Sequence, residues 1–446
     1  MLKITFYGAA QEVTGSCYLL ESKNKKILID CGMFQAPKFC DDRSREPLPF
    51  DSKEISAIFL THAHIDHSGR IPRLVAEGFA GDIYSTEPTR ALGELMLNDS
   101  VGVLQKEHRN KNERLIYTEE DVARAMHLWR GINYHESIIV GDLDIKLYRS
   151  GHILGASMVF IECQDKKILF TGDLGNPNNP LLFGPETVSG VTHLIIETTY
   201  GDRVHEEARE RKLKLERAIE RSVLRGGVLM IPAFSLERTQ EMLLEITTML
   251  RERQIPQIPI FVDSPLAIGA SKIYEQYADY LNRAWAEGEI KFLQFPAIHY
   301  TPTTDDSKRI NDVKPPKIII AGSGMSTGGR ILHHERRYLP DPNSTILFIG
   351  YQVPGSLGRI IQDGADEVII MGETIPVRCY REVIQGYSAH PDREALFDFA
   401  RAHSENLKKV FATHGEPKAS LAFVQYIRDN LGIDAIAPKA GESVEL

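Results

Sequence analysis

The sequence of 446 residues has few cysteines, no long apolar run and no excess of positive charge. Its five cysteines are scattered without paired spacing, which argues against a disulfide framework or a cysteine-type zinc site and favours a reducing cytoplasm. No apolar run is long enough to span a membrane, and residues 1–6 are typical of a strand rather than of a signal peptide. The sequence therefore predicts a cytoplasmic protein that makes no membrane contact.

The formal net charge of −9 counts against simple electrostatic capture of a polyanion, because nucleic-acid binders are often basic. A local basic groove is still compatible with this balance, and bound metal cations would offset part of the acidity at a site. A hydrophobic content of 42% and a charged content of 25% are ordinary for a globular protein, and the length suggests two or three domains.

The densest group of candidate metal ligands lies in the segment 61–67, which reads THAHIDH. An apolar run at 57–60 precedes it and a helical pattern follows at 70–75, so the segment is predicted to be a strand-to-helix turn where side chains converge. Histidine and aspartate suit zinc, and also manganese or iron. One metal could take His62 and His64, and a second could take Asp66 and His67.

Further candidate ligands follow other predicted strands. His152 lies in 150–156, Asp173 follows the apolar run 167–171, and His414 follows 409–413. Each alone would be a weak signal, and the segment 61–67 alone could be a polar loop that happens to be rich in histidine. Together the donors suffice for two metals if Asp173 bridges, with His62, His64, His152 and Asp173 on one and Asp66, His67, Asp173 and His414 on the other. Asp30, which ends another buried strand, is predicted to orient a ligand histidine or the bridging water.

The pattern of strands and helices changes after residue 202. Up to there, apolar strand runs alternate with turns and a few helices, which predicts two sheets packed face to face with helices outside. From 206 to 349, strands alternate with helices, which implies a mainly parallel sheet covered on both faces. The polar stretch 300–316 is predicted to be a surface loop, and from about 385 a helix, a strand and a helix close the chain.

These ligand motifs resemble those of the metallo-β-lactamase superfamily. The insertion that follows narrows the resemblance to the β-CASP branch of nucleic-acid hydrolases. The segments ETTYGD at 197–202, SAHPD at 388–392 and THGE at 413–416 look like the acidic, second histidine and third histidine motifs of that branch. The segments 232–238, 322–330 and 350–359 also match, although Val353, Pro354 and Pro391 depart from the usual residues. The resemblance covers essentially the whole chain and is greatest to the short form related to the cleavage and polyadenylation endonuclease.

The resemblance implies an α/β fold, a metallo-β-lactamase αββα sandwich with an inserted β-CASP α/β domain of mainly parallel sheet. The expected domains are the first part of the metallo-β-lactamase core at 1–200, the insertion at 201–384 and the return to the core at 385–446. The expected activity is that of a ribonuclease with two zinc ions per chain, which hydrolyses phosphodiester bonds of single-stranded RNA. Endonuclease cleavage is expected, and 5′–3′ exonuclease activity is an additional possibility. A homodimer is also compatible with the resemblance.

The expected chemistry needs a proton donor besides a metal-activated water. His390 is predicted to protonate the leaving oxygen, because an imidazole pKa of about 6.5 needs only a small shift for this task. Glu197 is predicted to hold it, since the resemblance pairs their motifs. The alternatives are a capping or surface histidine for His390 and a buried acid without a catalytic part for Glu197. The predicted catalytic residues are His390, Glu197, Asp66 and Asp30.

The glycine-rich segment 322–330 follows the strand 317–321 and offers backbone N–H groups and hydroxyls to a phosphate. The predicted phosphate contacts are Ser323, Gly324, Arg330 and Ser388. The alternatives are a tight turn for the glycines and a solvated surface charge for the arginine.

Three alternative functions are compatible with parts of the sequence. They are a DNA-directed nuclease of the same branch, a small-molecule thioester or lactam hydrolase, and a binding subunit that has lost its metals. The first histidine cluster does not separate a lactamase from a nuclease, whereas the insertion and His390 favour the nuclease. The complete ligand set argues against a binding subunit.

Overall fold

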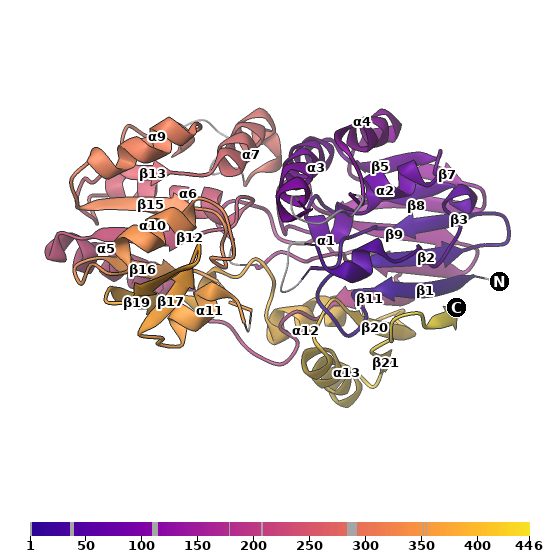
Figure 1. Cartoon of the computed structure of the whole chain (residues 1–446). Coiled ribbons are helices and arrows are strands. Elements are labelled where there is room, and N and C mark those ends of the chain that lie inside the picture. The colour runs from indigo at the N-terminus through magenta and orange to yellow at the C-terminus, as the bar shows by residue number, and fades with distance from the viewer. Residues whose placement is uncertain are drawn as a thin grey trace. The chain divides into compact units, whose positions relative to one another are not determined.

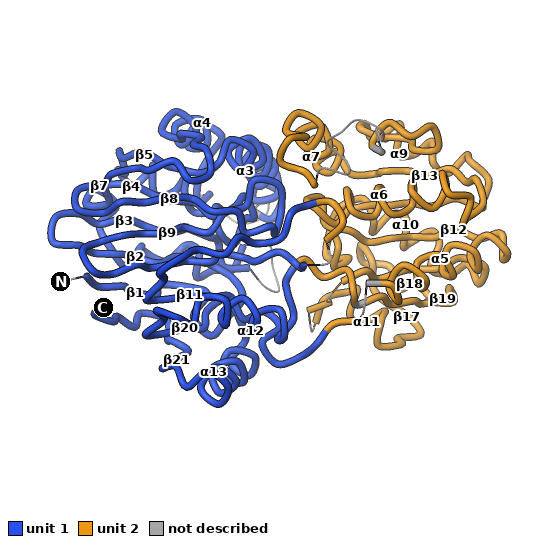
Figure 2. Tube along the Cα trace, turned by 180° about the vertical axis from the view of Figure 1, so that it is seen from behind, with its two compact units in different colours: residues 1–177, 182–204, 390–446 blue, residues 178–181, 205–389 orange. Residues whose placement is uncertain are grey.

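The computed structural model describes residues 2–35, 40–108, 115–177, 179–206, 208–282, 292–350, 352–353 and 355–446. The chain divides into two compact units (Figure 2). Unit 1 contains residues 1–177, 182–204 and 390–446, and unit 2 contains residues 178–181 and 205–389. Residues 205–389 therefore form nearly all of unit 2, and the chain returns to unit 1 at His390.

Two seven-stranded sheets form unit 1. The first has the order β22-β1-β2-β3-β4-β5-β6, with β1 Lys3–Gly8, β2 Cys17–Glu21, β3 Lys26–Ile29, β4 Ala57–Phe59, β5 Asp82–Thr86, β6 Trp129–Ile132 and β22 Ser443–Glu445. The second has the order β21-β20-β11-β10-β9-β8-β7, with β7 Ile138–Val140, β8 Leu143–Arg149, β9 Ser157–Cys163, β10 Lys166–Phe170, β11 His193–Glu197, β20 Lys409–Thr413 and β21 Asp434–Ile436. The two ends of the chain meet in the first sheet, where β22 pairs with β1 in antiparallel fashion (Figure 1).

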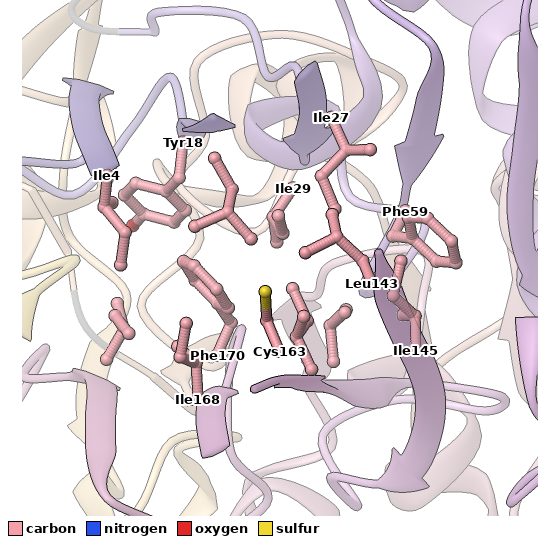
Figure 3. Packing of buried hydrophobic residues seen from close by; sticks show 14 of the residues in the cluster. Ile4, Tyr18, Ile27, Ile29, Phe59, Leu143, Ile145, Cys163, Ile168 and Phe170 are labelled. Atoms are coloured by element: carbon pink, nitrogen blue, oxygen red, sulfur yellow. The ribbon is translucent and has the colours of Figure 1, made fainter. Parts of the chain in front are cut away.

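The inner faces of the two sheets share one apolar core. Alternate residues of each strand point into it, as period-two patterning dictates. Figure 3 shows Ile27, Ile29 and Phe59 of the first sheet above Leu143 and Ile145 of the second. Aromatic rings also meet across the sheets, with the centroids of Tyr18 and Phe170 5.9 Å apart. This core joins the two sheets into a sandwich.

Helices cover both outer faces of the sandwich (Figure 1). The first sheet packs against α1 Ile65–Ser68, α2 Ile71–Ala76, α3 Glu87–His108 and α4 Glu119–Leu128, and the second against α12 Arg393–Ala402 and α13 Pro417–Leu431. Leu28 and Ile58 share a buried cluster with Leu74 of α2, which ties sheet and helix together. The αββα sandwich expected from the resemblance is confirmed.

Unit 2 is built around a six-stranded sheet whose described pairings are all parallel. Its order is β14-β13-β15-β12-β16-β19, with β12 Val228–Pro232, β13 Ile260–Val262, β14 Ile298–Tyr300, β15 Lys317–Ala321, β16 Thr345–Phe348 and β19 Tyr380–Val383. The helices are α5 Ala208–Arg225, α6 Arg238–Arg251, α7 Pro265–Gln276, α9 Thr304–Arg309, α10 Ile331–Tyr338 and α11 Leu357–Gln362, and β17 Glu367–Ile370 forms a hairpin with β18 Glu373–Pro376. The expected inserted domain of mainly parallel sheet is confirmed.

The described residues also form short 3-10 helices, namely η1 Asp42–Arg45, η2 Ser52–Glu54, η3 Ala278–Tyr280, η4 Phe292–Gln294, η5 Ile310–Asp312 and η6 Gln385–Tyr387. The prediction of a plain loop at 300–316 is wrong, because α9 and η5 lie within it. Thr303 and Asp306 form a capping box that starts α9, with each side chain accepting a hydrogen bond from the other's backbone N–H. Among the described residues, no helix combines the length and apolarity needed to cross a bilayer.

Candidate metal centre and active site

Three segments that carry residues of the site meet because their strands are parallel neighbours. β10, β11 and β20 lie side by side with the same direction, so their carboxyl ends share one edge of the second sheet. Asp173 follows β10, Glu197 is the last residue of β11, and His414 follows β20. The turn that carries His152 joins β8 to β9 at this same edge, since β9 is antiparallel to β10.

The segment 61–67 reaches the site from the first sheet. His62 and His64 follow β4, while Asp66 and His67 lie on the short helix α1. The turn around Gly172 approaches this segment closely. Its φ is 52°, and a Cβ placed there would lie 2.6 Å from Cβ of Thr61. Only glycine therefore lets the Asp173 turn lie against the first histidine segment.

Asp173 presents its two carboxylate oxygens to two separate groups of donors. Oδ2 lies 3.4 Å from Nε2 of His62 and 3.5 Å from Nε2 of His152. Oδ1 lies 3.3 Å from Nε2 of His67 and 3.5 Å from Nε2 of His414. A carboxylate with one oxygen in each group has the arrangement of a bridging ligand between two metals.

The remaining donors complete both groups. Nδ1 of His64 lies 3.1 Å from Nε2 of His62 and 3.3 Å from Nε2 of His152. Oδ2 of Asp66 lies 4.0 Å from Nε2 of His67 and 3.9 Å from Nε2 of His414. The structure thus brings together all seven predicted ligands, as His62, His64, His152 and Asp173 on one side and Asp66, His67 and His414 on the other.

These residues fit a pair of divalent cations. Donor atoms about 2.1 Å from a tetrahedral zinc are roughly 3.4 Å from one another, which is close to the separations around Asp173. Oδ1 of Asp173 is buried and has no hydrogen-bond partner among the described residues. A buried carboxylate oxygen left without a donor is costly, and a metal would satisfy it.

The protonation of three of the ligand histidines also suits metal binding. Burial lowers the pKa of His62 and of His64 to about 3, and that of His152 well below its usual value. These imidazoles are therefore neutral at pH 7 and can offer a nitrogen lone pair. Although burial alone would raise it, the histidines around Asp173, with His414 first, hold the pKa of its carboxyl well below the usual range.

Asp30 orients two of the ligand histidines from behind. This fully buried carboxylate accepts hydrogen bonds from Nδ1 of His67 at 2.7 Å and from Oγ1 of Thr61 at 2.9 Å. Nδ1 of His62 lies 3.0 Å from the same Thr61 hydroxyl. Hydrogen bonds at Nδ1 turn the Nε2 lone pairs of His62 and His67 towards Asp173.

Ser16 is a contact residue that the sequence interpretation missed. Its hydroxyl lies 3.2 Å from Nδ1 of His414 and 3.4 Å from Nε2 of His67, and its backbone N–H donates to the carbonyl of Asp66. A serine before a predicted strand carries no metal-site signal of its own. Only the packing of β2 beside the ligand segments reveals it. Thr61, by contrast, could have been noted from its place directly before His62.

His390 lies beside the ligand groups and is held by Glu197. Its Nδ1 atom is 3.0 Å from both carboxylate oxygens of Glu197, which is buried, and 3.4 Å from Oγ1 of Thr199. Although burial alone would lower it, Glu197, with smaller contributions from Asp173 and Asp66, raises the pKa of His390 to about 9. The ring is therefore protonated at neutral pH, and its centroid is 4.7 Å from that of His152.

The four predicted phosphate contacts belong to unit 2 and have varied surroundings. Oγ of Ser323 lies 3.1 Å from Oγ1 of Thr327, and the carbonyl of Gly324 accepts from Nε2 of Gln352. Arg330 donates to the buried carboxylate of Asp263 and to two backbone carbonyls. Ser388 is buried. Arg330 therefore braces the end of its own loop, which a solvated surface arginine would not do.

Comparison with known proteins agrees with this architecture. Residues 10–220 match the model of the metallo-beta-lactamase superfamily, residues 239–361 that of the Beta-Casp domain, and residues 374–438 that of the Zn-dependent metallo-hydrolase RNA specificity domain. A crystal structure of a protein of unknown function from Enterococcus faecalis V583 covers 100% of both chains with a TM-score of 0.57 at 15% identity. That likeness concerns the fold alone.

Curated relatives match over nearly the whole chain. Ribonuclease TTHA0252 of Thermus thermophilus is 35% identical over 94% of this chain and 95% of its own length. The RNase J-like protein of Methanocaldococcus jannaschii is 32% identical over 99% of both. The transcription termination factor FttA of Methanosarcina mazei is 29% identical over 100% of this chain and 72% of its own. The chain therefore belongs to the β-CASP branch of the metallo-β-lactamase superfamily and is a metal-dependent hydrolase of this branch of RNA-processing nucleases.

Proposed function

We propose that the protein is a zinc-dependent ribonuclease that cuts single-stranded RNA with a metal-activated water and a histidine general acid. The observation that carries this proposal is the Asp173 carboxylate, whose two oxygens face two groups of donors, beside the His390–Glu197 pair. A lactam or thioester hydrolase has no need of a second histidine acid of this kind. One relative named as a ribonuclease and one named as RNase J-like, both of similar length, add support.

When bound, two zinc ions would supply a water that ionises near neutral pH and would neutralise charge on the phosphodiester oxygens. His62, His64 and His152 would hold one ion, Asp66, His67 and His414 the other, and Asp173 both. Asp30 keeps two of these imidazoles in the tautomer that offers Nε2. The protein's part in this step is to fix the ligands and to keep their lone pairs directed inward.

The leaving oxygen takes its proton from His390. Glu197 accepts the hydrogen bond from Nδ1, so Nε2 of the imidazolium is the ring atom that donates. The charge of Glu197 keeps His390 protonated while it waits for substrate. A flexible single strand can bend to place one phosphodiester beside both ligand groups and His390, whereas a duplex is stiffer.

Digestion of end-labelled nucleic acids by the zinc-loaded protein tests the proposal. Single-stranded RNA, single-stranded DNA of the same sequence and the RNA duplex are compared, with chelator-treated protein as the control. The expected result is internal cleavage of the single-stranded RNA, lost on chelation and restored by zinc. Stepwise release of mononucleotides from the 5′ end would instead assign the exonuclease mode. Cleavage of DNA alone, or hydrolysis of a lactam or thioester without any cleavage of RNA, would overturn the proposal.

A further inference from the structure

Four charged side chains are buried together in unit 2, beside the segment that leads to His390. They are Arg211 on α5 and Arg238, Glu241 and Glu245 on α6. Arg211, Arg238 and Glu241 are 3%, 7% and 1% exposed, and the side chain of Glu245 is 10% exposed. Charged groups are seldom this deeply buried unless they are paired, so the cluster needs an explanation.

The two arginines donate to consecutive backbone carbonyls. Nη1 of Arg211 lies 2.9 Å from the carbonyl oxygen of Gly386, and Nη1 of Arg238 lies 2.6 Å from that of Tyr387. These residues end η6, three positions before His390. The cluster therefore fixes the direction of two peptide groups in the segment that delivers the proposed acid.

The two glutamates hold the arginines in place. Nη2 of Arg211 lies 3.4 Å from Oε1 of Glu241 and 3.6 Å from Oε1 of Glu245. Nη1 of Arg238 bonds to Oε2 of Glu241. Glu241 thus links both guanidinium groups. Arg211 contacts the acids through Nη2 and the backbone through Nη1, whereas Arg238 uses Nη1 for both contacts.

Packing around Gly386 and Tyr387 tightens the same connection. Tyr387 is fully buried, and the guanidinium carbon of Arg211 lies 4.7 Å from its ring centroid. A Cβ on Gly386 would lie 3.1 Å from Cβ and 3.3 Å from Cδ of Arg211, closer than ordinary van der Waals contact. Residues 386–387 are therefore closely packed against α5.

A buried ion-pair cluster is a poor source of stability. The cost of removing the charges from water offsets most of their attraction, and apolar residues of the same volume often serve as well or better. Charged groups can instead fix orientation, because the donors of a planar guanidinium have a rigid geometry and hold their hydrogen-bond acceptors in place. The arrangement thus suits a role in positioning more than a role in stabilising unit 2.

We propose that Arg211 and Arg238, held by Glu241 and Glu245, are positioning residues for His390, which they place by fixing the backbone of Gly386 and Tyr387. This inference rests on the proposed function, in which His390 protonates the leaving oxygen. Glu197 fixes the ring of His390, and the cluster fixes the chain that carries it. A displacement of a reacting group by about 1 Å can cost on the order of a hundredfold in rate.

The test uses Arg211→Lys and Arg238→Lys, which keep the charge and lose the planar fork. Arg225→Lys is the matched control, because Arg225 lies on the same helix as Arg211, stacks on Tyr380 and donates to Thr345, away from residues 386–389. We expect kcat on single-stranded RNA to fall about ten- to a hundredfold in both test variants, with KM and zinc content unchanged. The control should keep the unmodified rate.

Two further readouts separate positioning from a merely structural role. On bis(p-nitrophenyl) phosphate, whose leaving group needs no proton, the test variants should match the unmodified protein, and the ratio of the two rates does not depend on the folded fraction. In a His390→Ala background, Arg238→Lys should cost RNA cleavage less than twofold. Equal losses on both substrates, or a full additional loss in the His390→Ala background, would overturn the inference. If instead His390→Ala itself cleaves RNA at the unmodified rate, the proposed function fails and not this inference alone.

Discussion

The Nδ1 atom of His390 lies 3.0 Å from both carboxylate oxygens of Glu197, although the two residues are 193 positions apart in the sequence. The same carboxylate accepts a hydrogen bond at 2.7 Å from the backbone N–H of Leu174, directly after Asp173. Glu197 is thus bonded both to the proposed acid and to the turn that carries the proposed bridging ligand. One buried side chain sets the geometry between the two.

Glu197→Gln should lower the rate of RNA cleavage, but by less than the loss of about 100- to 10,000-fold that is expected for His390→Ala. The amide can still contact Nδ1, but it no longer keeps the ring protonated. The double variant should be little slower than His390→Ala alone, because the two residues act as one unit. Single-turnover rates of the four proteins measure this coupling. Fully additive losses would show that Glu197 acts elsewhere.

The rate should fall at alkaline pH as His390 loses its proton. Burial alone would lower the pKa of His390, but Glu197, together with Asp173 and Asp66, raises it to about 9. Because the acid must be protonated, kcat/KM should be level at neutral pH and fall as the pH rises through about 9. In Glu197→Gln the raising charge is gone, so the fall should move to lower pH. Profiles with the same alkaline midpoint for both proteins would contradict this assignment.

Asp173→Asn should lower the affinity of both metal sites for zinc. The carboxylate faces both groups of donors, so its loss affects each of them. His64→Ala should weaken one of the two sites, because its Nδ1 contacts His62 and His152. Elemental analysis should find about two zinc per unmodified chain. Asp142→Asn is the control, since Asp142 binds Ser22 away from the ligands. Equal zinc content in Asp173→Asn and this control would refute the bridging role.

Substitutions of Ser323 and Arg330 should have different effects, the first mainly on RNA binding and the second on stability. Ser323→Ala should raise the Kd for RNA and change the free energy of unfolding by less than about 0.5 kcal/mol, as surface changes do. Arg330→Ala should destabilise the protein by roughly 1–3 kcal/mol, because it removes a donor from the fully buried Asp263. Binding titrations and thermal unfolding check the two. An unchanged Kd in Ser323→Ala would make the loop structural.

The ligand residues could be found from the sequence because each one lies on, or a few residues beyond, an apolar run that ends at the shared sheet edges. Asp173 and His414 show this most plainly, since a buried strand that stops at a polar residue leaves that side chain at the sheet edge. Their mutual contact could be expected only through the resemblance, because positions 173 and 414 are 241 apart in a chain of 446 residues. The parallel pairing of β10, β11 and β20 is the physical reason for it.

The residues that the sequence did not reveal act through tertiary packing. Ser16 contacts His414 and His67 only because β2 lies beside the ligand segments. Arg211 and Glu245 look like ordinary surface charges of amphipathic helices, yet Arg211 is buried against the carbonyl of Gly386 and pairs with Glu245. Helix α9 is a different case, because its capping box of Thr303 and Asp306 can be recognised in the sequence. The polar residues and prolines around it favour a loop, and they led to the wrong prediction.

The most direct test of the account is the rate of His390→Ala on single-stranded RNA, measured together with its zinc content. We expect a loss of about 100- to 10,000-fold in the rate of cleavage, with about two zinc ions retained and RNA binding unchanged. On a diester whose leaving group needs no proton, the loss should be small. A variant that has lost a zinc ion would make His390 a ligand, and one that cuts RNA at the unmodified rate would contradict the account.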